Sequence, residues 1–300
     1  MTNRQLIETY LNSIALLSKT TIRNRKSFLN ALFQDFSQSF LELTATHLRE
    51  YIIKKKESGV WTKATTIAQK IILLKIFFQF LSNEGYLKEE TNPTKFLKTP
   101  KQRIEGELRT LNAQEIRALI KAAESSAIEL KQKLLFYLAM TSGLRASEIC
   151  TIKKANIDLD RCLIFIPREN VKGQYREKLV PISNRAKELI EIYTVKHPNN
   201  IEYLFDNRFG RCIAPLAVYQ AMKDIIDTAY PYKNSWKKPY GPHLARHTFA
   251  SRWIESGGDW HALRAIMGWR SFAQFDRYVN VSPEFIARSA AKVQKKLLKV

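Results

Sequence analysis

The second half of the sequence holds three short clusters whose residue types suit phosphate chemistry. In the first, G-L-R-A-S-E, Arg145 follows Gly143 at the start of an expected helix. An arginine in such a position can point at an anion together with backbone N–H groups. A hexapeptide of this kind is by itself more often an ordinary surface arginine, so it carries weight only in combination with others.

The second cluster, P-H-L-A-R-H, contains His243 and Arg246 three residues apart. On a helix these two side chains share a face. A guanidinium makes paired charged hydrogen bonds to a phosphate, and an imidazole moves a proton near neutral pH. Taken alone, the string also fits a helix start with solvated side chains.

The third cluster is M-G-W, which ends at Trp269 and is followed by Tyr278. A tyrosine is usually a half-buried structural residue. A nucleophilic tyrosine needs assistance because its reference pKa is about 10, and nearby arginines favour the phenolate. The indole N–H of Trp269 offers a further hydrogen-bond donor.

Together the clusters fit the transfer of a phosphodiester. Two arginines can hold the equatorial oxygens on which charge develops, and a tyrosine nucleophile divides the exchange into two covalent steps. The sequence contains no carboxylate cluster and no His/Cys ligand set that indicates a metal. We therefore expect no cofactor and no metal, with cationic side chains in their place.

Residues 1–91 are predicted to form a small bundle of four helices, because their apolar residues recur at helical spacing. The expected caps are Thr20 or Thr21 for the second helix, Thr44 for the third and Thr62 for the fourth, which ends at Gly85. The apolar stripes consist of Leu6, Tyr10, Ile14, Leu17, Phe28, Leu29, Leu32, Phe33, Leu48, Tyr51, Ile52, Ile67, Ile71, Leu74, Phe77, Phe78 and Leu81.

Residues 92–106 change in composition, with two prolines and a glycine, and are predicted to be a linker. Residues 107–300 form the second predicted domain, with a β-hairpin of 163–167 and 178–182 around a turn at Lys172. Its helices are expected from Asn112 and at 134–140, 186–196, 214–230, 246–256, 259–267 and 282–300. The predicted fold is mainly α with a small β-sheet: a helical bundle followed by an α+β domain.

The formal net charge of +21 indicates a polyanionic partner, of which nucleic acid is the commonest. An anionic membrane is the second possibility. The apolar run 71–81 is interrupted by Lys75 and is too short to cross a bilayer, which takes about 20 residues. No signal peptide is visible, and the cysteines lack C-x-x-C spacing. These features predict a reduced, cytoplasmic protein.

The order of G-L-R-A-S-E, V-K-G, H-L-A-R-H, M-G-W and a following tyrosine resembles the tyrosine recombinase (integrase) family, in particular its two-domain Xer-like members. The resemblance covers nearly the whole chain, and P-x-H-x-x-R-H-T-F-A is a highly specific string. It implies that the N-terminal bundle is a SAM-like core-binding domain and that residues 107–300 form the catalytic domain.

The resemblance implies a role for each matching residue. Arg145 and Arg246 match the arginines that bind the scissile phosphate. Tyr278 matches the nucleophile that forms a 3′-phosphotyrosyl link. Lys172 matches the lysine that protonates the leaving 5′ oxygen. His243 matches the residue that assists proton transfer at the nucleophile.

Two further positions match with differences. Trp269 stands where the family has histidine or tryptophan, and Glu148 where it often has an acidic residue that supports the site. Ala245 replaces a common leucine. The segment from Lys172 to Pro181 is one residue longer than the usual pattern. Lys178 is therefore the alternative proton donor, ahead of Lys153 and Lys154.

The resemblance also implies partners: double-stranded DNA with an inverted-repeat site, held in a clamp of the two domains, and a homotetramer on that DNA. A partner recombinase or an activating protein is compatible with it. The candidate DNA contacts in the bundle are Arg23, Arg25, Lys26, Lys63 and Lys70. The helix 282–300 is expected to dock on a neighbouring subunit.

The predicted function is site-specific DNA recombination through a Holliday junction, as in dimer resolution or mobile-element integration. A type IB topoisomerase shares the chemistry but needs one subunit, and the expected oligomerising tail argues against it. A DNA-binding regulator with a silent site is the other alternative. The presence of Arg145, Arg246 and Tyr278 argues against that one.

Overall fold

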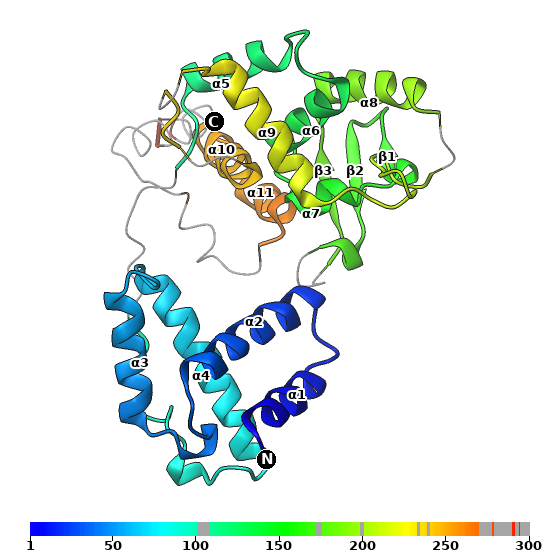
Figure 1. Cartoon of the computed structure of the whole chain (residues 1–300). Coiled ribbons are helices and arrows are strands. Elements are labelled where there is room, and N and C mark those ends of the chain that lie inside the picture. Colours follow the sequence, from blue (N-terminus) through cyan, green and yellow to red (C-terminus); the bar gives the residue numbers. More distant parts are fainter. Residues whose placement is uncertain are drawn as a thin grey trace. The chain divides into compact units, whose positions relative to one another are not determined.

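The computed structural model describes residues 1–100, 109–171, 176–198, 201–232, 235–238 and 241–269, together with positions 278, 290, 291 and 294. The chain divides into two compact units, Met1–Gly106 and Glu107–Val300 (Figure 1). Lys172 and most of the expected helix 282–300 lie outside the described residues.

The first unit contains the four predicted helices. They are α1 (Asn3–Ser13), α2 (Lys19–Asp35), α3 (Ala45–Glu57) and α4 (Ala64–Asn83), with 3-10 turns at Phe40–Glu42 and Glu89–Thr91. Thr44 caps α3 as predicted, with its side chain accepting from the His47 N–H. The predicted cap of α2 was wrong: Ser18 caps it, because its oxygen accepts from the N–H of Thr21, which already lies within the helix. Lys63, rather than Thr62, precedes α4 and makes no side-chain cap.

Helix α4 forms the centre of the first unit's core. Its buried side chains are Ile67, Ala68, Ile71, Leu74, Phe77, Phe78 and Leu81. The expectation that no apolar stretch is long enough to span a bilayer was wrong, because the 20 residues of α4 suffice by length and composition. One face of α4 is buried against residues of α1, α2 and α3, such as Leu6, Leu29 and Leu48. This burial is typical of a core helix in a folded domain.

The second unit combines helices with a small antiparallel sheet. Its helices are α5 (Ala113–Ala123), α6 (Leu130–Thr141), α7 (Ala146–Cys150), α8 (Asn184–Lys196), α9 (Pro215–Ala229), α10 (Pro242–Glu255) and α11 (Trp260–Met267). Its strands are β1 (Ile157–Asp158), β2 (Leu163–Ile166) and β3 (Lys178–Pro181), in the order β1-β2-β3, with 3-10 turns at Lys154–Asn156 and Arg168–Asn170. The predicted pairing of β2 with β3 is confirmed, with Ile164 opposite Val180. Strand β1 was not predicted.

Helix α6 is the central element of the second unit. Six consecutive residues, from Leu134 to Ala139, are buried, so the helix is apolar on all sides. It packs against α8, α9 and α10, which surround it (Figure 1). This packing fixes both the loop that follows α6, which carries Arg145, and the helix α10, which carries Arg246.

Helix α10 begins at Pro242, four residues before its predicted start, so His243 lies within the helix. Proline suits the first helical position because its missing N–H has no intrahelical partner there. Helix α11 has the predicted cap at Asp259 and the predicted end at Gly268, whose φ of 62° is left-handed. A small core of Ala250, Ile254, Leu263, Met267 and Trp269 joins the two helices.

Candidate active site

Arg145 and Glu148 form the first part of the site, at the start of α7. The backbone N–H of Arg145 donates to Glu148 Oε2 at 2.9 Å, and its Nη1 donates to Oε1 at 2.9 Å. The Glu148 side chain is completely buried, whereas 21% of the Arg145 side chain is exposed. The carboxylate therefore fixes Arg145 through its backbone and its side chain, while part of the guanidinium stays exposed to solvent.

Lys178, the first residue of β3, supplies the second cation on Glu148. Its Nζ donates to Glu148 Oε2 at 2.7 Å, and its side chain has no exposed surface. Burial lowers the pKa of Lys178 to about 8, against the opposing effect of Glu148. Burial alone would raise the pKa of Glu148, but Lys178 and the Arg145 N–H hold it below its ordinary value. The buried ammonium of Lys178 therefore fixes the position of the Glu148 carboxylate.

Of the other lysines considered for proton donation, Lys153 forms an ion pair with Glu202, with Nζ 2.6 Å from Oε1. Lys154 lies in the neighbouring 3-10 turn. Lys172, which the family resemblance favours, is outside the described residues.

The guanidinium of Arg246 hydrogen-bonds to two separate segments of the chain. Its Nη1 donates to the carbonyl of Gly143, and its Nη2 donates to the carbonyl of Met267 at 2.5 Å. Burial, together with the nearby charge of Arg145, lowers the pKa of Arg246 to about 10. Arg246 thereby ties the loop before α7 to the end of α11.

These groups create an excess of positive charge. Arg145, Lys178 and Arg246 influence one another electrostatically and share a single buried carboxylate, Glu148. Gly268 lies against the same cluster, since a Cβ added there would be 3.2 Å from Lys178 Cδ. Three cations around one carboxylate favour the binding of an anion such as a phosphodiester.

Tyr278 lies beside this cationic cluster. Its hydroxyl is 2.5 Å from Nδ1 of His247, and its ring lies 4.9 Å from that of Trp269, at an interplanar angle of 30°. Trp269 is only 4% exposed. Tyr278 is also close enough to Arg246 to affect its pKa. The structure thus places Arg145, Arg246, Trp269 and Tyr278 in one region.

The two histidines of α10 lie on the same helical face, four residues apart. Their ring centroids are 6.3 Å apart, and His243 is the more exposed of the two. His247 was not among the predicted site residues, although it belongs to the P-H-L-A-R-H string. Its spacing from His243 was the available signal, because residues four apart on a helix are neighbours.

The five basic candidates of the first unit differ in their surroundings. Arg23, Lys26 and Lys63 are exposed. Arg25 donates from Nη1 to the hydroxyl of Tyr10 at 2.6 Å. Lys70 lies over the ring of Phe28, with Nζ 5.0 Å from its centroid, and burial lowers its pKa.

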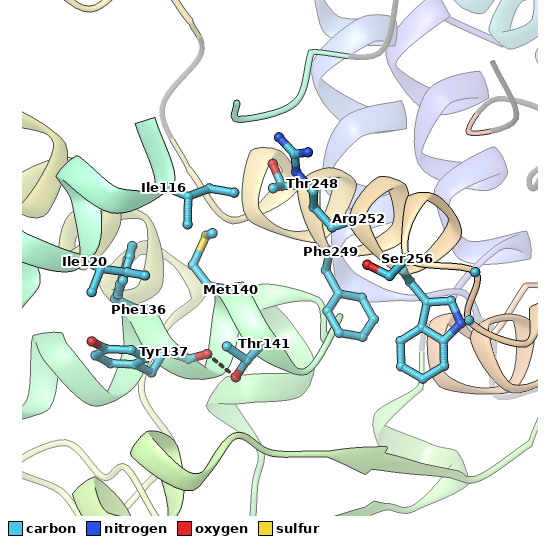
Figure 2. Close-up of a pocket in the computed structure, with 13 residues that line it drawn as sticks. Ile116, Ile120, Phe136, Tyr137, Met140, Thr141, Thr248, Phe249, Arg252 and Ser256 are labelled. Carbon is cyan, nitrogen blue, oxygen red and sulfur yellow. Dashed lines mark hydrogen bonds between the residues drawn. The ribbon is translucent and has the colours of Figure 1, made fainter. Parts of the chain in front are cut away.

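An apolar cavity of about 560 Å³ lies between α5, α6 and α10, away from these groups. Figure 2 shows Ile116, Phe136, Met140 and Phe249 around it, with the Thr141 hydroxyl donating to the Tyr137 carbonyl at 2.7 Å. None of the predicted catalytic side chains lines it. Its composition, with few polar groups, does not suit a phosphate, so we do not assign it to the reaction.

Comparison with known proteins agrees with this geometry. Residues 109–284 match the phage integrase family, and residues 7–85 match the phage integrase N-terminal SAM-like domain. Tyrosine recombinase XerC from Chlamydia pneumoniae is 30% identical over 81% of this chain and 75% of its own length. Tyrosine recombinase XerC from Bacillus licheniformis is 25% identical over 84% of this chain and 81% of its own length.

Solved structures share the fold at low sequence identity. The Tn1549 transposon integrase in complex with transposon right end DNA superimposes with a TM-score of 0.77 at 18% identity, covering 98% of this chain and 100% of that one. A lambda integrase dimer bound to a COC′ core site gives a TM-score of 0.73 at 18% identity, covering 94% and 97%. With both domain models matched in order, this chain belongs to the phage integrase family and is a Xer-like tyrosine recombinase.

Proposed function

We propose that this protein is a site-specific recombinase that cuts and rejoins double-stranded DNA with Tyr278 as its nucleophile. The observation that carries the proposal is the placement of the Tyr278 hydroxyl against His247, which directly follows Arg246, within electrostatic range of that arginine in a cluster with excess positive charge. A tyrosine next to arginines is suited to attack a phosphodiester, because the same cations stabilise the phenolate and the transition state.

In the proposed reaction, Arg145 and Arg246 bind the non-bridging oxygens of the scissile phosphate. Arg246 has five N–H donors, of which Nη1 and Nη2 each use one on the carbonyls of Gly143 and Met267, and we propose that its other donors serve the phosphate. Tyr278 Oη attacks phosphorus and forms a 3′-phosphotyrosyl link, while the bond to the 5′ oxygen breaks. The phosphodiester energy is retained in this link, so rejoining requires no cofactor.

We assign the protonation of the leaving 5′ oxygen to Lys172. The burial of Lys178 supports this choice, because its ammonium is enclosed and bonded to Glu148. Lys178 and Glu148 then hold Arg145 in place. The resemblance implies that His243 assists proton transfer at the nucleophile. Because His243 is exposed and the Tyr278 hydroxyl lies against His247, we propose instead that His243 contacts the phosphate. The Trp269 ring is assigned to the positioning of Tyr278.

The division of labour follows the two matched domain models. We propose that residues 1–91 bind the core DNA site, that 92–106 link the units, and that 107–300 carry out the chemistry. The working assembly is a homotetramer on inverted-repeat DNA that proceeds through a Holliday junction, with 282–300 docking on a neighbouring subunit. A lambda integrase tetramer bound to a Holliday junction shares the fold with a TM-score of 0.69.

The biological task we infer is chromosome or plasmid dimer resolution, or mobile-element integration, in the cytoplasm. The reaction is compatible with a partner recombinase or an activating protein. Relatives named tyrosine recombinase XerC are compatible with either task. A type IB topoisomerase is disfavoured by the match to the integrase family and its N-terminal domain. A silent regulator is disfavoured by the assembled Arg145, Arg246 and Tyr278.

The test is to mix the protein with sheared genomic DNA of its source, trap covalent complexes in SDS and sequence the attached ends, with Tyr278→Phe in parallel. We expect adducts that depend on Tyr278 and map to a defined inverted repeat. Adducts scattered over many sequences would instead favour a topoisomerase. Tight binding without any adduct would contradict catalysis by this chain alone.

A further inference from the structure

The geometry points to His247 as a catalytic residue that takes the proton from the Tyr278 hydroxyl during strand cleavage. This inference rests on the proposed function and assigns a role to a side chain outside the sequence-predicted set. It begins with the contact of 2.5 Å between His247 Nδ1 and Tyr278 Oη. A base must lie within hydrogen-bond reach of the proton that it removes, and His247 meets this requirement without movement.

The surroundings of this contact fix both partners. His247 directly follows Arg246, which is anchored by the carbonyls of Gly143 and Met267, so the first turns of α10 are held in place. The ring of Tyr278 stacks on Trp269, which is itself buried in the small core between α10 and α11. His247 is therefore held on a packed helix, and the Tyr278 ring lies against the buried Trp269, so base and nucleophile meet at hydrogen-bond distance, as proton transfer requires.

The position of His247 also separates its role from that of His243. His243 is exposed, one helical turn earlier on the same face, and its ring centroid is 6.3 Å from that of His247. His243 is thus placed to meet bound DNA, while His247 lies behind it against the nucleophile. The two histidines are suited to different tasks on one face of α10.

The Oη–H bond of Tyr278 breaks as the Oη–P bond forms, and the proton moves to Nδ1 of a neutral His247, which becomes an imidazolium. The P–O5′ bond breaks, and the 5′ oxygen takes a proton from the general acid assigned above, Lys172. On rejoining, the 5′ hydroxyl attacks phosphorus and gives its proton to the now neutral Lys172. The Oη–P bond breaks, and His247 returns its proton to the departing Tyr278 oxygen.

The first test reads the tautomer of His247 without DNA, so it is independent of the recombinase proposal. In protein labelled with ¹⁵N-histidine, we expect a bare Nδ1 and a protonated Nε2 for neutral His247, assigned by the loss of its signals in His247→Asn. Nδ1 that carries the proton in the neutral ring would mean that His247 donates to Tyr278, and would overturn the inference.

The second test measures the rate at which the Tyr278 adduct forms on a synthetic DNA duplex that carries the site identified by SDS trapping. The duplex is nicked near the cleavage position, so that the short cleaved fragment diffuses away and the strand is not rejoined. We expect His247→Ala to slow adduct formation by about 10²–10⁴-fold, the usual contribution of a general base. His247→Asn keeps a polar group near the Nδ1 position but takes up no proton, so we expect it to remain more than about tenfold slower than wild type. Added imidazole should partly restore His247→Ala.

The controls separate this inference from the proposed function. His261→Ala, an exposed histidine on α11, should react at the wild-type rate. Thermal unfolding and gel shifts should show that His247→Asn folds and binds DNA as the wild type does. If wild type forms the adduct and both His247 variants keep its rate, only the role of His247 is wrong. If wild type forms no Tyr278-dependent adduct, the proposed function and this role fail together.

Discussion

Lys178 Nζ lies 2.7 Å from Glu148 Oε2, and neither side chain has any exposed surface. This ion pair connects the first residue of β3 to the first turn of α7. Because the other carboxylate oxygen accepts from Arg145 Nη1, the pair also fixes the guanidinium that we assign to the phosphate. A residue of the hairpin thus helps to position the arginine that we assign to the phosphate.

A double-mutant cycle tests this pair. Glu148→Gln should destabilise the fold by about 3–5 kcal/mol, because it leaves the buried Lys178 ammonium without its carboxylate. Lys178→Met should cost less, because Glu148 keeps its bonds to Arg145. The double variant should lose less than the sum of the two, since it removes both buried charges. Urea unfolding measures all three free energies.

The exposed pair Lys153–Glu202 provides the matched control, since its side chains are 31% and 57% exposed. Lys153→Met should change the free energy of unfolding by no more than about 1 kcal/mol. Strictly additive losses for Lys178→Met and Glu148→Gln would show that the two buried groups do not stabilise each other.

The lowered pKa of Lys178 predicts a specific pH dependence. The pKa is about 8 in the folded protein, against an ordinary 10.5, so between these values the unfolded chain binds more protons at this residue. The contribution of Lys178 to stability is therefore smallest below pH 8 and rises as the pH increases towards 10.5, by up to about 1.4 kcal/mol per unit. The stability of wild type relative to Lys178→Met should rise between pH 7 and pH 9.5 in urea unfolding. An unchanged difference would mean that Lys178 titrates normally.

Arg246→Lys should be strongly impaired although it preserves the charge. The guanidinium donates to the carbonyls of both Gly143 and Met267 from a buried position, and an ammonium does not reproduce this fork. One carbonyl left without a donor costs about 1–3 kcal/mol of stability. We expect a lower melting temperature and loss of the Tyr278 adduct. A variant with wild-type stability and adduct yield would contradict the bridging role of Arg246.

Gly143→Ala should disturb the site through the backbone. Gly143 has a φ of 65°, and an added Cβ would lie 2.7 Å from Cδ1 of Phe249. The left-handed conformation alone costs about 1–2 kcal/mol for a residue with a Cβ, and the contact with Phe249 adds to it. Adding Phe249→Leu should recover the part due to the contact and leave the conformational part. Full recovery would show that backbone strain is unimportant here.

Much of this arrangement was predictable from local patterns. The helices of the first unit, the pairing of β2 with β3, the cap at Asp259 and the left-handed Gly268 all follow from signals within a few residues. The cap of α2 was missed because several neighbouring residues carry a hydroxyl that could cap the helix. In the structure it is Ser18 whose hydroxyl accepts from the Thr21 N–H.

The contacts that define the site were less accessible to sequence reasoning. Lys178 and Glu148 are 30 positions apart, and His247 and Tyr278 are 31 apart. A lysine in a hairpin reads as solvated, and its burial depends on how β3 packs against α7 and α11. The motifs contain the residues that we assign to the reaction, whereas the groups that hold them depend on tertiary packing, which no local pattern encodes.

The surroundings of the basic residues in the first unit predict a graded dependence of DNA binding on salt. Lys26 is exposed, whereas Lys70 lies over the Phe28 ring and is partly buried. If Lys26 neutralises a phosphate, Lys26→Ala should reduce the slope of log K against log salt by about 0.9. Lys70→Ala should leave the slope nearly unchanged and lower the melting temperature instead, because it removes packing against Phe28. Gel shifts at several salt concentrations, on the duplex recovered from the covalent adducts, measure the slopes. The reverse pattern would mean that Lys70 leaves the Phe28 ring to bind DNA and that Lys26 is merely solvated.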